Sequence, residues 1–155
     1  MLGTIVPSII DPALYIDDLK VRRRDSVLLE MVERARLAGA VRWPDPLLEL
    51  LSVREMFGTT APGRGIAVPG VRSIVVTECR IVIARSRRGI DWGAADSLPV
   101  HLVFLALSPA DCSEGSHLEL IARIVAAARP QRSRQKMIDA KGFEPIAAVL
   151  REVMP

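Results

Sequence analysis

The sequence predicts one α/β domain in which a mixed β-sheet is sandwiched between helices. Two segments with helical periodicity come first, two apolar segments typical of strands lie in the middle, and helical patterns return from residue 116 onward. An amphipathic helix must bury its apolar side against another element, so helices before and after strands favour a layered fold. The 155 residues suffice for one hydrophobic core and are few for two. We therefore expect a single domain over residues 1–155.

Two helices are expected before any long strand. The first should follow Asp25 or Ser26, either of which can cap it, and should stop at Gly39. The second should have Asp45 as its cap and should end before Gly58. Both segments carry apolar residues at helical spacing, which gives each helix one side for the core.

The middle of the chain contains the expected strands. Residues 58–70 are rich in Gly, Thr and Pro, which is typical of a structured loop. Residues 74–84 are rich in β-branched side chains and predict a strand that a turn at 85–89 closes. Residues 91–99 then form a connection to 100–107, whose nearly continuous apolar run predicts a central strand covered on both faces.

Three helices are expected in the last third of the sequence. Ser116 and Glu119 have the spacing of a capping box, and the helix that they begin should end near Pro130. Shorter helical patterns follow at residues 132–140 and 145–153.

Composition excludes several classes of function. Half of the residues are hydrophobic and a quarter are charged, which indicates a globular protein and not a disordered chain. The net charge of +3 comes with 18 acidic residues against 21 basic ones, and aromatic side chains that could stack on bases make up only 4%. We therefore expect solvated charged faces and no nucleic-acid partner.

The sequence also predicts a cytoplasmic protein without membrane insertion. Its longest apolar runs, such as residues 102–107, are far shorter than the roughly 18 residues that a membrane helix needs. The first ten residues lack a basic leader and a cleavage signal. Cys79 and Cys112 stand alone, which favours two reduced thiols.

Familiar catalytic motifs are incomplete. Residues 58–65 have the glycine spacing of a Walker A loop, but Arg64 replaces the lysine, Gly65 replaces the hydroxyl residue, and the segment follows a helix. Cys112 and His117 are close in sequence without an identifiable third group. We expect no metal site, because His101 and His117 are the only histidines, and His101 in an apolar strand suggests a hydrogen-bonded structural residue. No cofactor is implied.

Several stretches, in order along nearly the whole chain, resemble one family. The segments are Val53-Arg54-Glu55, Gly58-Thr59-Thr60, residues 65–69 (GIAVP), residues 89–92 (GIDW), residues 98–100 (LPV), residues 102–104 (LVF), Ser108-Pro109 and His117-Leu118. They are similar to the enzyme IIA domains of the bacterial sugar phosphotransferase system, of the fructose/mannitol type that includes the nitrogen-regulatory branch. The resemblance implies the same mixed sheet between helices.

The resemblance also implies a chemistry that this chain lacks. In the family, a histidine directly after the G-I-A-x-P segment accepts phosphate from a histidine phosphocarrier protein. The phosphate then passes to a sugar permease component or remains as a regulatory mark. Gly70 stands at that position here, and glycine has no nucleophilic nitrogen. We therefore expect no catalytic residue at the usual position.

Other residues match the family's phosphate pocket. His117 matches a second histidine that lies beside the acceptor, and Arg54 matches an arginine that supports the site. With Thr59, Thr60 and Gly70 they would form a degenerate phosphate pocket that is able to hold an anion. A guanidinium suits this role because its planar donors match phosphate oxygens.

Arg64 and Arg72 flank the altered loop and are candidate anion contacts. Purely structural roles are the alternative: Arg54 capping a helix end, Arg64 and Arg72 solvated, and His117 simply starting a helix.

The leading functional hypothesis is a regulatory or interaction protein, not an enzyme, that acts by binding partner proteins. A transporter, a sensor kinase or a phosphotransferase-system component would be such a partner. The alternative is an active phosphocarrier in which His117 accepts phosphate in place of the missing histidine. Natural loss and deliberate replacement at Gly70 are equally compatible with the sequence.

Overall fold

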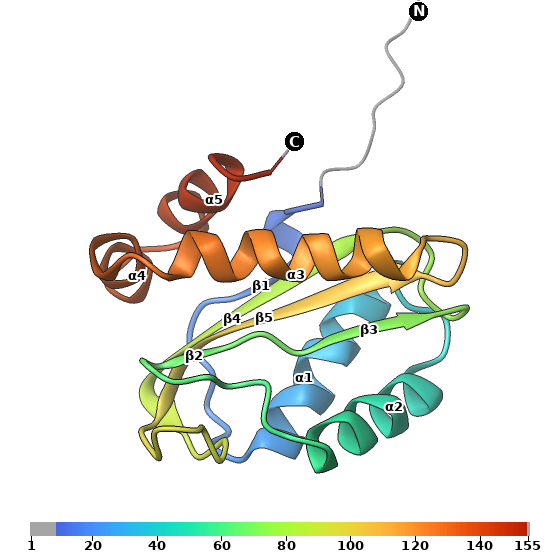
Figure 1. The fold of residues 1–155 in the computed structure, drawn as a ribbon, viewed down its shortest axis with the longest axis horizontal. Coiled ribbons are helices and arrows are strands. Elements are labelled where there is room, and N and C mark those ends of the chain that lie inside the picture. The colour runs from blue at the N-terminus through green and yellow to red at the C-terminus, as the bar shows by residue number, and fades with distance from the viewer. Residues whose placement is uncertain (1–8, 155) are drawn as a thin grey trace, which may run out of the picture.

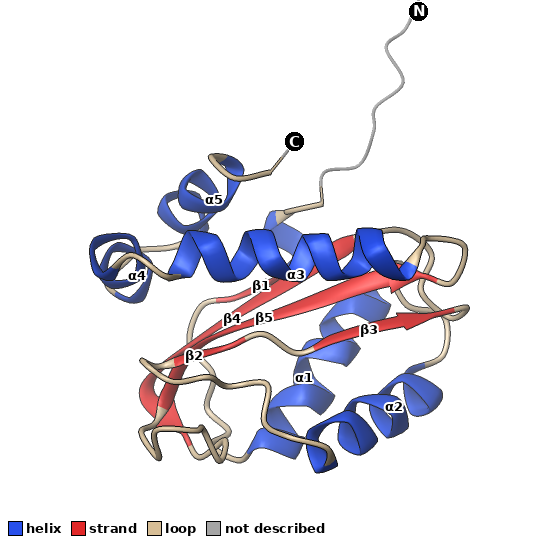
Figure 2. Ribbon diagram, viewed as in Figure 1, coloured by secondary structure: helices blue, strands red, loops and turns tan. Residues whose placement is uncertain are grey.

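The computed structural model describes residues 9–154, in which helices cover both faces of one five-stranded sheet (Figures 1 and 2). The helices are α1 (Arg24–Leu37), α2 (Pro44–Met56), α3 (Glu114–Ala128), α4 (Gln131–Ile138) and α5 (Phe143–Arg151), preceded by a 3-10 turn at Pro12–Leu14. Helices α1 and α2 lie on one face of the sheet, and α3 with α4 and α5 lies on the other. The predicted α/β sandwich is confirmed.

The sheet is mixed and its strands have the order β1-β4-β5-β2, with β3 also paired to β5. The strands are β1 (Tyr15–Ile16), β2 (Ile66–Ala67), β3 (Gly70–Ser73), β4 (Arg80–Ile90) and β5 (Val100–Pro109). Strand β4 is antiparallel to β5 and parallel to β1, whereas β2 and β3 run parallel to β5.

Strand β5 separates the two hydrophobic cores. Each residue from 102 to 107 is fully buried, which matches the central strand predicted from the apolar run. Side chains alternate between the faces, so that Val103 and Leu105 join the core beneath α1 and α2 while Leu102 and Phe104 join the core beneath α3 to α5.

Strands β2 and β3 are two parts of one interrupted edge strand. Ile66 pairs with Leu102 and Gly70 pairs with Ala106, so both segments lie along the same side of β5. Pro69 falls in the interruption, where a residue without an N–H costs no ladder hydrogen bond. Its carbonyl still accepts from Ala106 N at 2.9 Å, which keeps the two segments in register.

The strand predicted at residues 74–84 is wrong in its first half. Residues 74 and 75 form a turn, in which Val75 N donates to Ser73 Oγ and Val76 N to Ser73 O, and Val76 makes only an isolated bridge with Val41. Ile74 is 77% exposed. The turn predicted at residues 85–89 is also wrong, since β4 continues through it to Ile90 with an irregularity in its pairing to β5. Val75 and Val76 are buried at this turn and bridge, which composition cannot distinguish from a strand.

Helix ends lie within about three residues of the predicted ones, but the caps differ. Ser113 caps α3 by accepting from Ser116 N at 3.0 Å, so the predicted capping box at Ser116 and Glu119 is wrong. Helices α1 and α2 begin after Arg23 and Trp43, neither of which makes a side-chain cap. The predicted caps Asp25, Ser26 and Asp45 therefore fall inside the first turns, where the acidic ones favour the helix dipole.

Arg85, inside the segment predicted as a turn, is a buried residue of β4 that ties three elements together. Its side chain is 2% exposed and its guanidinium donates to the Asp17 backbone at 3.1 Å and to the Asp17 carboxylate at 2.7 Å. It also donates to the carbonyls of Ile138 and Ala140 at the end of α4. A buried guanidinium is tolerated here because four acceptor contacts replace water.

We predict that Arg85→Ala lowers the free energy of unfolding by about 3 kcal/mol, because it leaves buried carbonyls without a donor and opens a void. Arg87→Ala is the matched control, since Arg87 is exposed and only approaches Asp17 at 4.0 Å. It should change the unfolding free energy by less than about 0.5 kcal/mol. Urea unfolding followed by circular dichroism measures both, and equal losses in the two variants would contradict the role given to Arg85.

Candidate functional site

Gly70 and His117 lie side by side where β3 begins and α3 starts. A Cβ added at Gly70 would lie 3.3 Å from Nε2 of His117 and 2.8 Å from Cδ1 of Ile121. The edge strand and the first turns of α3 therefore bring together the two residues on which the predicted site depends. The Ile121 methyl group occupies the space that a side chain at position 70 would need.

The His117 ring is held from the side opposite Gly70. Ser113 caps α3 and sets the helix start, which turns His117 toward the sheet, and the residue is buried. Its Nδ1 lies 2.7 Å from the hydroxyl oxygen of Ser108, near the end of β5. When Nδ1 donates to Ser108, Nε2 carries the lone pair and faces Gly70.

The pKa of His117 is lowered from its ordinary value of 6.5. Burial is the largest cause, because it disfavours the charged imidazolium, and the positive charge of Arg72 acts in the same direction. Glu114 opposes both effects. The ring is therefore neutral at pH 7 and can act as a hydrogen-bond acceptor or a nucleophile at Nε2.

Arg72 lies two residues after Gly70 on β3 and is exposed. Its guanidinium donates to the carbonyls of Cys112 at 2.8 Å and of Ala110 at 3.5 Å, so it holds the loop before α3. Arg72 contributes positive charge near His117, and part of its hydrogen-bonding capacity is already used by these carbonyls.

Arg54, predicted to support the site, makes its hydrogen bond within the loop that follows α2. Its guanidinium donates to Gly58 O at 2.8 Å, and the side chain is exposed. Among residues 9–154, no hydrogen bond joins Arg54 to His117. The described contact of the Arg54 side chain is therefore with the loop just beyond the end of α2.

The two threonines are fixed by local hydrogen bonds. Thr59 Oγ1 accepts from Ala61 N at 3.1 Å, whereas both the amide and the hydroxyl of Thr60 donate to the carboxylate of Glu55. Thr60 O in turn accepts from Val68 N at 3.0 Å, which lays the loop along the outer side of the edge strand just before Gly70.

Sequence reasoning assigned no role to Glu55, which the structure identifies as the anchor of this loop. It is a buried carboxylate at the end of α2. The signal was its place beside Arg54 in a helix end followed by Gly-Thr-Thr, where an acceptor for the loop's N–H groups is needed.

Arg64 lies apart from Gly70 and His117. Together with Arg129 and Arg134 it lines a cavity near the far end of α3. His101, predicted to be structural, has its Nδ1 2.8 Å from Ser86 O, which confirms a hydrogen bond to the backbone. Between residues 9 and 154, no three His, Cys, Asp or Glu side chains are grouped so that they could bind a metal. No helix in the same range is long and apolar enough to span a membrane.

The fold agrees with a match to one protein family. Residues 8–153 match the family described as "Phosphoenolpyruvate-dependent sugar phosphotransferase system, EIIA 2". Because the match covers almost the whole sequence, the chain belongs to this family of enzyme IIA domains.

The relatives of this chain include both nitrogen regulatory proteins and sugar-specific EIIA components. A nitrogen regulatory protein of Bradyrhizobium diazoefficiens is 32% identical over 146 residues, covering 94% of each chain. A fructose-specific EIIA component of Haloferax volcanii is 33% identical over 117 residues, covering 76% of this chain and 75% of the relative. The crystal structure of the nitrogen regulatory protein IIA-Ntr from Neisseria meningitidis shares the fold, with a TM-score of 0.83, 24% identity and coverage of 92% and 96%.

The lowered pKa of His117 predicts a pH dependence of stability. A depressed pKa in the folded protein means that stability is fully present above the unfolded value of 6.5 and is lost as pH falls below it toward the folded pKa. The free energy of unfolding of the wild type should therefore fall more steeply between pH 6.5 and 5 than that of His117→Gln.

NMR titration of the imidazole signals provides the direct measurement. His117 should titrate below 6.5, and Arg72→Gln should raise its midpoint because one positive charge is removed. A His117 midpoint above 6.5 in the wild type would show that burial does not govern the ring.

Proposed function

We propose that this chain is a regulatory member of the enzyme IIA family that binds partner proteins and does not carry phosphate. The observation that carries the proposal is Gly70 at the start of β3, with the Ile121 methyl group occupying the space in front of it and a neutral His117 alongside. The family's chemistry needs an imidazole at the acceptor position, and glycine cannot supply a nucleophile.

The exposed end of α2 supports a protein partner. Met56 is 81% exposed and Phe57 is 84% exposed, and both directly precede the loop held by Glu55. Large apolar side chains that water surrounds are typical of interaction surfaces. The expected partners are phosphotransferase-system components, transporters or sensor kinases. Cys79 and Cys112 are both free thiols, which fits the reducing cytoplasm as the place of action.

The second candidate is a phosphocarrier that uses His117. Its support is specific, because Nε2 of His117 faces Gly70 and carries the lone pair when Nδ1 donates to Ser108. Burial beside Ile121 opposes it, since phosphoryl transfer requires the donor, phosphorus and acceptor in line.

Incubation with phosphoenolpyruvate, the general phosphotransferase enzyme and the histidine phosphocarrier distinguishes these functions. The wild type should acquire no acid-labile phosphate detectable by mass spectrometry. Gly70→His should gain label, and the double variant with Ile121→Ala should gain more because the methyl group that crowds position 70 is gone. Stoichiometric label on His117 of the wild type would instead establish the second function.

Binding of the unphosphorylated histidine phosphocarrier tests whether this chain binds a partner protein, independently of phosphoryl transfer. If the exposed end of α2 is the contact, Phe57→Ser should weaken the affinity about tenfold, since a central aromatic anchor contributes about 1 to 2 kcal/mol. Leu98→Ser is the matched control, because Leu98 is 57% exposed in the loop before β5. Isothermal titration calorimetry measures both affinities. Equal affinities of the two variants would show that the end of α2 is not part of the interface.

A further inference from the structure

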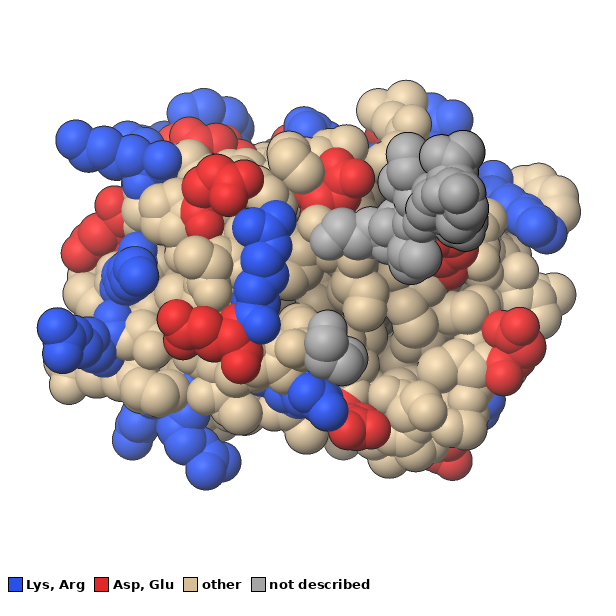
Figure 3. Space-filling model, turned by 90° about the horizontal axis from the view of Figure 1, so that it is seen from above, with Lys and Arg blue, Asp and Glu red and all other residues tan. Residues whose placement is uncertain are grey.

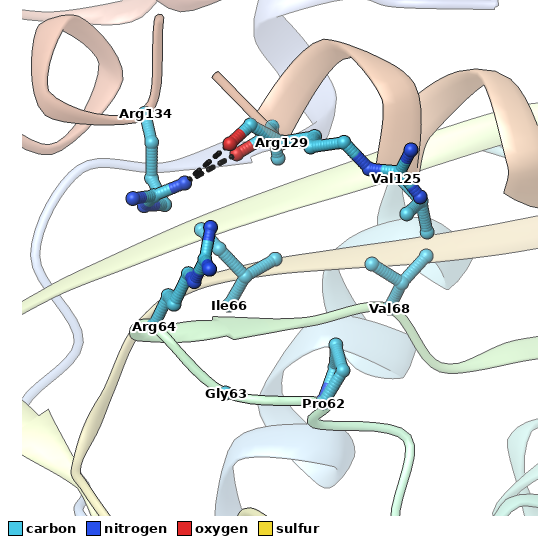
Figure 4. Close-up of a pocket in the computed structure, with 9 residues that line it drawn as sticks. Pro62, Gly63, Arg64, Ile66, Val68, Val125, Arg129 and Arg134 are labelled. Atoms are coloured by element: carbon cyan, nitrogen blue, oxygen red, sulfur yellow. Dashed lines mark hydrogen bonds between the residues drawn. The ribbon is translucent and has the colours of Figure 1, made fainter. Parts of the chain in front are cut away.

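A cavity lies on the same side of the sheet as Gly70, between the edge strand and the C-terminal half of α3 (Figure 4). Its volume is about 210 Å³. Apolar side chains from the edge strand and from α3 form its walls, and three arginines stand around it. The lining residues are Pro62, Gly63, Arg64, Ile66, Val68, Val125, Ala128, Arg129 and Arg134.

The cavity continues the line of contacts that begins at Gly70. On α3, Ile121, Val125 and Arg129 follow His117 at intervals of four residues, which places them on one stripe of the helix. His117 and Ile121 approach Gly70, and the next members of the stripe line the cavity.

The edge strand supplies the facing wall. Counting back from Gly70 in steps of two gives Val68 and Ile66, and both line the cavity, while Arg64 lies in the turn just before β2. In Figure 4 the side chains of Ile66 and Val68 point toward α3, and that of Arg64 rises beside them. The apolar walls thus come from the edge strand and from α3, whereas the arginines come from the turn before β2, the C-terminal end of α3 and α4.

Two of the three arginines are free to bind a ligand. Among the residues that the structure describes, the guanidinium groups of Arg64 and Arg129 have no hydrogen bond or ion pair, and both side chains are exposed. Arg134 donates to Ala128 O at 3.1 Å and to Arg129 O at 2.7 Å. It thereby covers the carbonyl end of α3, whose negative dipole would otherwise repel an anion.

Asp96 is an acidic group in contact with this loop, and its carboxylate already accepts two hydrogen bonds. Its carboxylate accepts from Arg64 N at 2.8 Å and from Leu98 N at 3.1 Å, and these bonds hold its pKa below the usual value. One carboxylate against three guanidinium groups leaves the cavity positive. Figure 3 shows the molecule from the side on which α3, α4 and α5 lie. Acidic and basic side chains are interspersed there, and basic ones gather at the end where α4 lies.

The backbone at Arg64 is held in an unfavourable conformation that presents its side chain. Arg64 has φ 61° between Gly63 and Gly65, both also at positive φ, and Asp96 fixes its amide. A non-glycine residue in the left-handed region is uncommon and persists only where its surroundings determine it. The loop therefore fixes the backbone from which the Arg64 side chain projects at the rim.

We propose that this cavity binds a small organic phosphate, with its apolar body against Val68 and Val125 and its phosphate group between Arg64 and Arg129. Phosphate suits guanidinium groups arriving from two different elements, because its three terminal oxygens can accept from both forks. The volume lies below the range typical of drug-sized ligands, which restricts the body to a compact group. This binding requires neither phosphoryl transfer nor a protein partner, so it stands independently of the proposed function.

Phenyl phosphate is a suitable probe, followed by ¹H–¹⁵N NMR shifts of the full chain. It should give saturable shifts at the amides of residues 62–68 and 125–134. Its affinity should exceed those of phenol and of inorganic phosphate by about tenfold each, because phenol lacks the charge and inorganic phosphate lacks the body. Benzoate separates phosphate from carboxylate preference and should bind more weakly than phenyl phosphate.

Arg64→Gln and Arg129→Gln should each weaken phenyl phosphate binding about tenfold. Arg42→Gln is the matched control, because Arg42 is an exposed arginine between α1 and α2 that does not line the cavity. This variant should bind phenyl phosphate as tightly as the wild type does. Arg64→Gly removes the same charge while relieving the positive φ, so it tests Arg64 even if the glutamine variant is unstable. Shifts confined to Gly70 and His117, no saturation, or equal weakening by Arg42→Gln would overturn the proposal.

Discussion

The pairing of the interrupted edge strand with β5 is the constraint on which the rest of the structure depends. Because β5 is buried on both faces, its register fixes which residues of β2 and β3 point toward α3 and which toward α1 and α2. Val71 and Ala67 enter one core while Val68 and Ile66 enter the other. A shift of one residue would turn Gly70 away from His117 and send buried valines to the wrong side.

The sequence predicted the architecture well because the strongest patterns were the most buried ones. The apolar run of β5 and the helical periodicities have few alternative interpretations once both faces must be covered. The errors fall where local chemistry is ambiguous. Arg85 belongs to a basic stretch that is typical of a turn, and only distant acceptors, Asp17 and the end of α4, make it a buried strand residue.

The same distinction holds for the site. Some of its residues could be predicted from sequence motifs, and others became evident only from the packing of the structure. The neighbourhood of Gly70 and His117 was anticipated from family-like motifs, and their approach follows from β3 and α3. Three contacts were not anticipated: Ser108 orients the His117 ring, Glu55 anchors Thr60, and Ile121 fills the space before Gly70. The contacts of Ser108 and Ile121 join elements that only tertiary packing brings together, so no local sequence signal could place them. Glu55 is different, because it lies only five residues before Thr60 and the helix end followed by Gly-Thr-Thr was a local signal for it.

The region of Gly70 and His117 and the arginine-rimmed cavity lie next to each other along α3, although they share no residue. Ile121 touches the space at Gly70, and Val125, one turn further along α3, lines the cavity that Arg64 and Arg129 border. A close-packed interface transmits a displacement of one side chain to its neighbours, because there is little free volume to absorb it. A ligand that spreads α3 from the edge strand at Val125 would therefore also change the packing of Ile121 against Gly70. Gly70 offers no nucleophile, so a phosphohistidine at that position cannot alter the region around His117. A ligand in the cavity would alter it instead through the stripe of α3 that the two sites share.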